Sequence, residues 1–219
     1  MKNKNLKIKL ILFLSVLIVS SETLHAQTEF GIKGGALYSG FRDNYQGMTF
    51  DFERKSGFLM GVYFKKHNLL GPVGLQTEFL YQLKGAETYI LYHGSENSGG
   101  YSSVGYFDKS SVPWLRDTEN YHYLSVPVLL SASPLKFLDI YAGPELGYLL
   151  SFSKNRQVTG DLNWFSAGLT TGLALKLSEN TKLDFRYSSD FTTLYDMGST
   201  NLKNQSFSFS VQQALFRKE

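Results

Sequence analysis

The chain has 219 residues, with 22 Lys and Arg residues, 19 Asp and Glu residues and no cysteine. The absence of cysteine excludes disulfides and a lipid anchor attached through an N-terminal cysteine. The length fits one domain, and no linker or change of composition divides it. Phenylalanine (17), tyrosine (14) and glycine (20) are abundant while proline (5) is scarce, which favours strands.

The first 26 residues have the pattern of a cleaved secretory signal peptide. Four lysines between positions 2 and 9 precede an apolar run over 10–19, and small and polar residues lead to Ala26. The apolar run is shorter than the about 20 residues of a membrane-spanning helix. We therefore predict a signal peptide at 1–26 and one domain at 27–219, with a retained membrane anchor as the alternative.

Removal of this segment changes the charge balance of the chain. The segment holds four of the basic residues and one of the acidic residues, so 18 of each sign remain in the mature domain. A domain without net charge lacks the basic surface that attracts nucleic acids. We expect no nucleic-acid partner.

The mature domain shows period-two alternation of apolar and polar residues in eight segments. In the clearest segment, Leu124, Val126 and Val128 alternate with Tyr123 and Ser125. The eight predicted strands cover about 29–40, 57–66, 73–92, 121–131, 138–152, 165–176, 183–191 and 206–215.

The connections between these strands alternate in length. Long connections are predicted at 41–56, 93–120, 153–161 and 196–203, and short ones at 67–72, 132–136 and 178–181. Short periplasmic turns that alternate with longer outside loops are typical of outer-membrane barrels. The long strands also suit a tilted crossing of the bilayer better than an ordinary soluble sheet.

The polar faces of the strands carry charges that would be costly inside a soluble core. In a barrel whose apolar face meets lipid, these charges point into the lumen, which eight strands fill with side chains. The predicted lumen charge network consists of Lys33, Glu78, Lys84, Glu145, Asp184, Arg186 and Asp190. Tyr92, Tyr121, Tyr148, Tyr195 and Trp164 lie near strand ends, as aromatic girdles at the membrane surface do.

The predicted fold is therefore all-β: an eight-stranded antiparallel up-and-down transmembrane β-barrel, closed and without a pore, in the outer membrane of a Gram-negative cell envelope. Closure leaves no unpaired strand edge in lipid. A soluble lipocalin-like barrel with its faces reversed is the alternative.

Four segments spread over nearly the whole mature chain resemble the PorT-like outer-membrane β-barrel family. They are FGIKGGALYSGF at 30–41, YHYLSVPVLL at 121–130, DIYAGPELGYLL at 139–150 and SFSFSVQQALF at 206–216. The resemblance implies an outer-membrane barrel and, for a founding member of that family, a part in protein secretion. Most members have no assigned activity, so secretion is not expected of this chain on this ground. The three residues after Phe216 depart from the usual aromatic C-terminus of such barrels.

No catalytic, cofactor or metal site is expected. Barrels that deacylate lipid A carry a histidine and a serine two residues apart on one strand surface, but His122 and Ser125 are three apart and fall on opposite faces. The remaining mature histidines, His67 and His93, lie in separate connections and cannot converge on a metal. Asp184 and Asp190 are expected about 20 Å apart on the lumen face.

The segment 93–120 is the candidate for partner recognition. It combines glycine and serine with four aromatic residues, Tyr101, Tyr106, Phe107 and Trp114, a composition that recognition loops use. A mobile surface loop without a partner is the alternative. The expected role is structural or interactive, with outer-membrane lipid and an unknown protein as partners, and a small lipid- or ligand-processing barrel is the second functional hypothesis.

Overall fold

Eight long antiparallel strands build the molecule. Their bounds are β1 (Thr28–Arg42), β2 (Phe50–Leu70), β3 (Val73–Leu91), β4 (Trp114–Leu135), β5 (Leu138–Ser153), β7 (Phe165–Lys176), β8 (Thr181–Asp190) and β10 (Asn201–Lys218). Two short strands, β6 (Asp161–Leu162) and β9 (Tyr195–Asp196), lie in the connections that flank β7 and β8. This computed structural model describes residues 28–42, 50–70, 72–91, 114–153, 161–196 and 201–218, so the predicted signal peptide lies outside the described residues.

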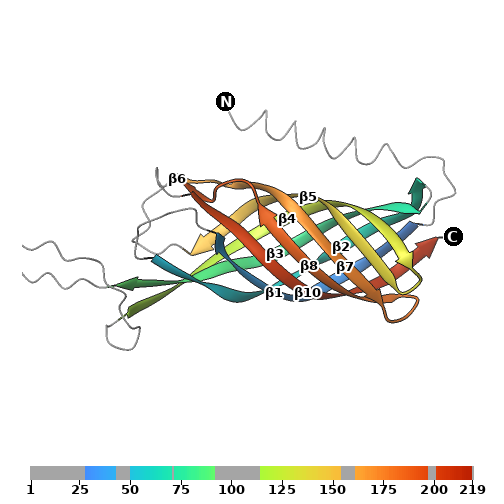
Figure 1. The fold of residues 1–219 in the computed structure, drawn as a ribbon, viewed down its shortest axis with the longest axis horizontal. Helices are drawn as coiled ribbons and strands as arrows, with labels where there is room; N and C mark the ends of the chain where they lie inside the picture. Colours follow the sequence, from blue (N-terminus) through green and yellow to red (C-terminus); the bar gives the residue numbers. More distant parts are fainter. Residues whose placement is uncertain are drawn as a thin grey trace, which may run out of the picture.

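The long strands close into a barrel in their sequence order (Figure 1). Each long strand pairs with the next one along the chain, and β1 pairs with β10 over its whole length, from Thr28 opposite Lys218 to Arg42 opposite Lys203. The first and last strands therefore satisfy each other's backbone groups, which a bilayer could not do. The predicted eight-stranded antiparallel barrel is confirmed.

The strand alternation places charge inside the barrel and apolar side chains outside. In β1, Glu29, Lys33 and Leu37 are buried while Ile32 and Tyr38 are about half exposed. The same outward exposure of large apolar residues continues around the wall, for example at Met60, Phe79, Leu130, Ile140, Leu169, Phe185 and Phe209. Such a wall is suited to hydrocarbon rather than water.

The strands extend further at both ends of the barrel than the sequence indicates. At the end with the short connections, β2 runs to Leu70 and β4 to Leu135, inside the predicted turns 67–72 and 132–136. β2 begins at Phe50, inside the segment 41–56 predicted as a connection, and β4 begins at Trp114, inside the predicted connection 93–120. The reason is that the register persists: the pairing of β3 with β4 continues to Leu91 opposite Trp114. Once neighbouring strands are aligned, backbone hydrogen bonds extend the ladder even where side-chain alternation has ended.

The short and long connections lie at opposite ends of the barrel. β2–β3, β4–β5 and β7–β8 are joined by two to four residues, whereas the other four connections are longer. Figure 1 shows the β7–β8 turn and the C-terminus at one end and β6 at the other. We call the end with the long connections the extracellular end and the other the periplasmic end, after the usual orientation of transmembrane β-barrels.

The prediction that Tyr121 belongs to the aromatic girdle is wrong. Tyr121 is completely buried and points into the lumen, since it shares a face of β4 with Tyr123 and Ser125. Tyr148 and Trp164 are about half exposed on the outside, as a girdle requires. The side chains of Tyr92 and Tyr195 lie outside the described residues.

Across the described ranges, no helix is long and apolar enough to cross a bilayer.

Candidate functional site

The centre of the lumen holds a neutral cluster of four charges from three strands. Arg186 of β8 donates from its two terminal nitrogens to Glu78 of β3, at 2.8 and 2.5 Å, and from Nε to Oδ1 of Asp184 at 2.9 Å. Lys33 of β1 lies 3.0 Å from the same Asp184 oxygen and 3.5 Å from Glu78. All four side chains are almost fully buried. Such ions need partners on every side, because their hydration has been lost.

Asp184 is the residue around which this cluster is arranged. Besides the two cations, it accepts hydrogen bonds from the Tyr141 hydroxyl, from Ser210 at 3.2 Å and from Gln212 at 2.6 Å. The Tyr141 ring also lies 4.6 Å from the Arg186 guanidinium carbon. Four strands, β1, β5, β8 and β10, thus meet at one carboxylate, and this cross-links opposite walls of the barrel.

A second cluster lies between the centre and the extracellular end. Glu145 of β5 accepts hydrogen bonds from Thr170 and from Ser188 at 3.1 Å, and it lies 3.7 Å from Lys84. Asp190 is also buried, but it forms no ion pair with a described residue, and its Oδ2 atom has no described hydrogen-bond partner. Asp190 is thus the predicted network member that the structure does not join by a salt bridge.

A third cluster, near the periplasmic end, was missed by sequence reasoning. Glu29 lies 3.0 Å from Lys182 and 2.9 Å from Arg217. Asp139 lies 2.7 Å from Lys65 and 3.6 Å from Lys182. The signal was present in the sequence, because Glu29 shares its strand face with Lys33 and Lys182 shares its face with Asp184. These residues lie near the periplasmic ends of their strands, where the alternation in the sequence is shortest.

An apolar layer closes the extracellular end of the lumen. Leu194, which follows β8, and Leu202 of β10 are buried against wall residues of β1, β4 and β5. The members of this layer are Phe41, Ala86, Tyr121, Tyr123, Leu149, Leu194 and Leu202. Backbone hydrogen bonds hold the layer in place: Asn163 N donates to Leu194 O at 2.9 Å, and Leu194 N donates to Leu202 O at 2.7 Å. We call β6, β9, Leu194 and Leu202 together the lid.

The predicted recognition residues fall at the edge of the described chain. Tyr101, Tyr106 and Phe107 lie outside the described residues, and Trp114 begins β4 although its side chain is not described. The strands that flank the segment 92–113, β3 and β4, end at Leu91 and begin at Trp114, opposite the end with the short turns.

The predicted separation of His122 and Ser125 is found in the structure. Ser125 is fully buried in the lumen, whereas His122 lies on the outer wall and its Nδ1 is 2.5 Å from the Tyr81 hydroxyl. Sequence spacing did not reveal a cross-strand neighbour of His122: the register places Ser151 of β5 directly opposite it, and Ser151 is exposed.

No group of three or more potential metal-binding side chains is found in the described part of the chain. Three buried polar atoms there lack a hydrogen-bond partner: Gln82 Oε1, Ser125 Oγ and Asp190 Oδ2. The amide nitrogen of Gln82 donates to Glu145 at 3.2 Å. The unpartnered oxygen of Gln82 therefore lies beside the second cluster.

A closed barrel with an apolar outer wall and a charged lumen is a transmembrane β-barrel. Residues 21–196 match the family described as outer membrane protein beta-barrel domain, and the chain belongs to that family. The protein is accordingly an outer-membrane protein.

Three solved structures are similar to this chain at low sequence identity. Ail, the attachment invasion locus protein of Yersinia pestis, is 14% identical, with a TM-score of 0.49 over 88% of this chain and all of Ail. Neisserial surface protein A is 12% identical, with a TM-score of 0.49 over 85% of this chain and 97% of the other. OprG from Pseudomonas aeruginosa is 12% identical, with a TM-score of 0.47 over 87% and 97% of the two chains. No curated protein matches the sequence.

Proposed function

We propose that this protein is a non-catalytic outer-membrane barrel that binds a partner in the cell envelope through its extracellular connections. The sealed lumen supports this role. Three layers of paired charges and an apolar layer fill the interior between the two ends, so the barrel serves as a rigid support rather than a passage.

The arrangement of the connections supports a binding role at the outer end. The strand ends joined by the long connections lie at that end, and the longest connection, 92–113, contains the aromatic residues Tyr101, Tyr106 and Phe107. Functional residues concentrate on loops held by a rigid scaffold. The resemblance to PorT-like barrels is consistent with a component of an envelope machine, and the partner is then a protein of that machine.

Site-specific photo-crosslinking in living cells tests this proposal. A photoreactive amino acid replaces Tyr106 in the outer connection, and a matched variant carries it at Lys136 in the short β4–β5 turn. We expect one reproducible protein adduct from position 106 and none of that mass from position 136. Equal adducts from both positions, or none from position 106, would contradict the proposal.

Single-channel recording tests the sealed lumen separately. The purified protein in a planar bilayer is expected to show no stepwise conductance, because the charge clusters and the apolar layer occupy the lumen. Stable conductance steps would show that the interior opens and would weaken the case for a purely supporting barrel.

A second candidate function, processing of a membrane lipid, is favoured by one feature of the outer wall. The side chains of register partners lie about 5 Å apart at Cβ, so His122 and Ser151 are neighbours facing the lipid. The Tyr81 hydroxyl contacts one ring nitrogen of His122. Activation of a serine by a histidine requires the free ring nitrogen, Nε2, to reach the serine hydroxyl, and the register brings these two side chains to neighbouring positions.

Mass spectrometry of lipids from cells that overproduce the protein separates the two functions. If the wall processes lipid, His122→Ala and Ser151→Ala each abolish a product that the unmodified protein forms. If the barrel is non-catalytic, the lipid profiles of all three strains are the same.

A further inference from the structure

Three basic side chains gather on the outer wall at its extracellular end. Arg42 of β1 and Lys203 of β10 are register partners, and Arg54 lies on β2, the other neighbour of β1. Arg42 points outward because its neighbour Phe41 points into the lumen, and Lys203 does so because Leu202 and Asn204 are buried. We call these three residues the basic rim.

The basic rim is not neutralised by the described protein. None of its three side chains forms an ion pair with a described carboxylate, unlike the lumen cations. Like charges placed directly opposite each other on adjacent strands are unfavourable. The pairing of Arg42 with Lys203 is therefore a place where an anion from outside the chain would be stabilising.

Arg54 is held flat against the wall. Its guanidinium carbon lies 4.8 Å from the centre of the Phe207 ring and 6.0 Å from that of Tyr38. Gly40 makes this path available, since a Cβ at that position would lie 2.8 Å from Arg54 Cγ. A guanidinium fixed in this way has less freedom to lose when it binds a phosphate with its planar fork.

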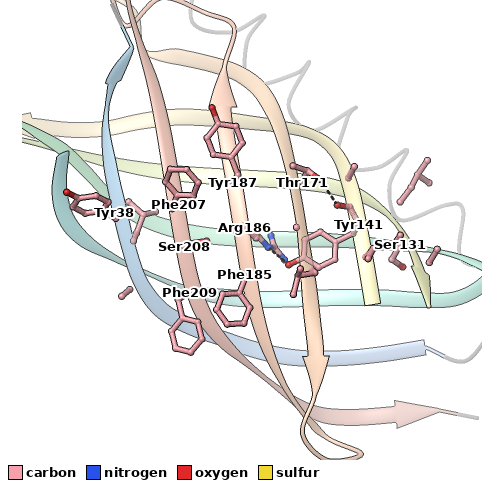
Figure 2. Close-up of a pocket in the computed structure, with 18 of the residues that line it drawn as sticks. Tyr38, Ser131, Tyr141, Thr171, Phe185, Arg186, Tyr187, Phe207, Ser208 and Phe209 are labelled. Atoms are coloured by element: carbon pink, nitrogen blue, oxygen red, sulfur yellow. Dashed lines mark hydrogen bonds between the residues drawn. The ribbon is translucent and has the colours of Figure 1, made fainter. Parts of the chain in front are cut away.

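A groove begins at the same two aromatic residues. It has a volume of about 1000 Å³ and crosses the outer wall between two rows of outward side chains. Figure 2 shows Tyr38, Phe207 and Tyr187 on one side of it and Phe209 and Phe185 on the other. The rings on each side of the groove contact each other: the centroids of Tyr187 and Phe207 are 5.0 Å apart, and those of Phe185 and Phe209 are 4.8 Å apart.

The rim and the groove together match a molecule with an anionic head and a long apolar tail. We propose that this part of the wall binds a phosphorylated lipid of the outer leaflet, with a phosphate between Arg42, Arg54 and Lys203 and an acyl chain in the groove. The depth agrees, because the rim lies at the extracellular end and the groove lies on the lipid-facing surface. This site depends only on the membrane location of the barrel and not on its binding a protein partner.

Native mass spectrometry of the full mature protein in detergent tests the site. The probes are lipid A bearing its phosphates, the same lipid A after chemical removal of the phosphates, and inorganic phosphate alone. We expect the protein to retain the phosphorylated lipid at least tenfold better than the dephosphorylated one. Each basic residue near an anionic surface strengthens binding about fivefold. The triple variant Arg42→Gln, Arg54→Gln and Lys203→Gln should therefore bind the phosphorylated lipid about 100-fold more weakly.

The matched control removes three basic residues at the periplasmic end, Lys66→Gln, Lys136→Gln and Lys218→Gln, and is expected to bind as the unmodified protein does. Ala36→Phe narrows the groove beside Phe209 and is expected to reduce retention of the lipid while the rim stays intact. Both multiple variants are first checked for the migration of a folded barrel.

Three results would overturn the proposal. Equal retention of the dephosphorylated lipid would show an apolar surface without headgroup recognition. An equal loss of lipid binding in the periplasmic triple variant would show that the net charge of the protein, and not the basic rim, sets the affinity. Displacement of the lipid by inorganic phosphate at equal concentration would show a free-anion site in which the groove has no part.

Discussion

At the scale of single residues, the stability of the barrel depends on each buried charge having partners of opposite charge. Arg186 shows this most clearly, since its guanidinium contacts Glu78 and Asp184 together and is nearly inaccessible to solvent. Removing one partner of a buried ion pair leaves the other charge without compensation. The residue is thus important for stability whether or not the lumen has a function of its own.

Arg186→Met is therefore expected to lower the free energy of unfolding by about 3–5 kcal/mol. Urea titration of the protein in lipid vesicles, followed by tryptophan fluorescence, measures the change. Lys136→Met, in the exposed β4–β5 turn, serves as the control and is expected to have little effect. A loss for Arg186→Met no larger than that of the control would show that the cluster is held by its remaining members.

Close packing at Gly31 is a second property of single residues. A Cβ at Gly31 would lie 2.6 Å from the Tyr63 ring and 2.3 Å from the Gln213 carbonyl oxygen, whereas one at Gly34 would meet only Leu59 O at 3.9 Å. The first position faces the crowded lumen and the second faces outward.

Gly31→Ala is expected to destabilise the barrel by about 1–3 kcal/mol through overpacking. Gly34→Ala, three residues away in the same strand, is expected to be close to neutral. The two variants are compared by urea unfolding under identical conditions. Equal effects would mean that strand propensity, rather than contact with Tyr63, sets the requirement for glycine.

At the scale of secondary-structure elements, the lid is the feature that closes the mouth. β6, β9 and the first residues of β10 form a small sheet of their own, with Leu162 opposite Tyr195 and Leu202 opposite Tyr195. This sheet carries Leu194 and Leu202 over the lumen. The lid contains few residues, so loss of its apolar contacts should open the mouth without unfolding the barrel.

Because the chain has no cysteine, a single introduced thiol reports directly on this closure. Ser125→Cys places a thiol at a fully buried position on the lumen face of β4, and a membrane-impermeant maleimide is expected not to label it. Labelling should rise when Leu194→Ala and Leu202→Ala are added. Rapid labelling with an intact lid would show that the mouth is already open.

At the scale of the whole molecule, closure of β1 against β10 gives the barrel no free edge. Arg217 strengthens this seam by binding Glu29 at 2.9 Å and the Glu179 carbonyl at 2.7 Å. Arg217 therefore has a structural role at the seam between the first and last strands.

A closed barrel of this kind is expected to resist SDS until it is heated. On a gel, the unboiled mature protein should migrate faster than the boiled protein and should show strand-rich circular dichroism. The absence of a mobility shift, combined with full solubility without detergent, would contradict the membrane barrel.

The limits of sequence reasoning are seen in particular residues. Alternation placed Lys33, Glu78 and Arg186 on lumen faces, and the structure brings these three together. The same reasoning missed Lys65 and Lys182 beside the turns, assigned Tyr121 to a girdle, and did not find Ser151 opposite His122. Each miss concerns a residue near a strand end or a neighbour on another strand.

The sequence by itself determined the fold class and the location, because the period-two pattern and the parity of the connections are properties of the chain read in order. Only the tertiary structure decided which charges meet in the lumen, that Leu194 and Leu202 are buried at its mouth, and that Arg42, Arg54 and Lys203 share one rim. The physical reason is that strand register is set by pairing between distant segments. A shift of one residue between two strands would exchange the lumen and outer faces of one of them.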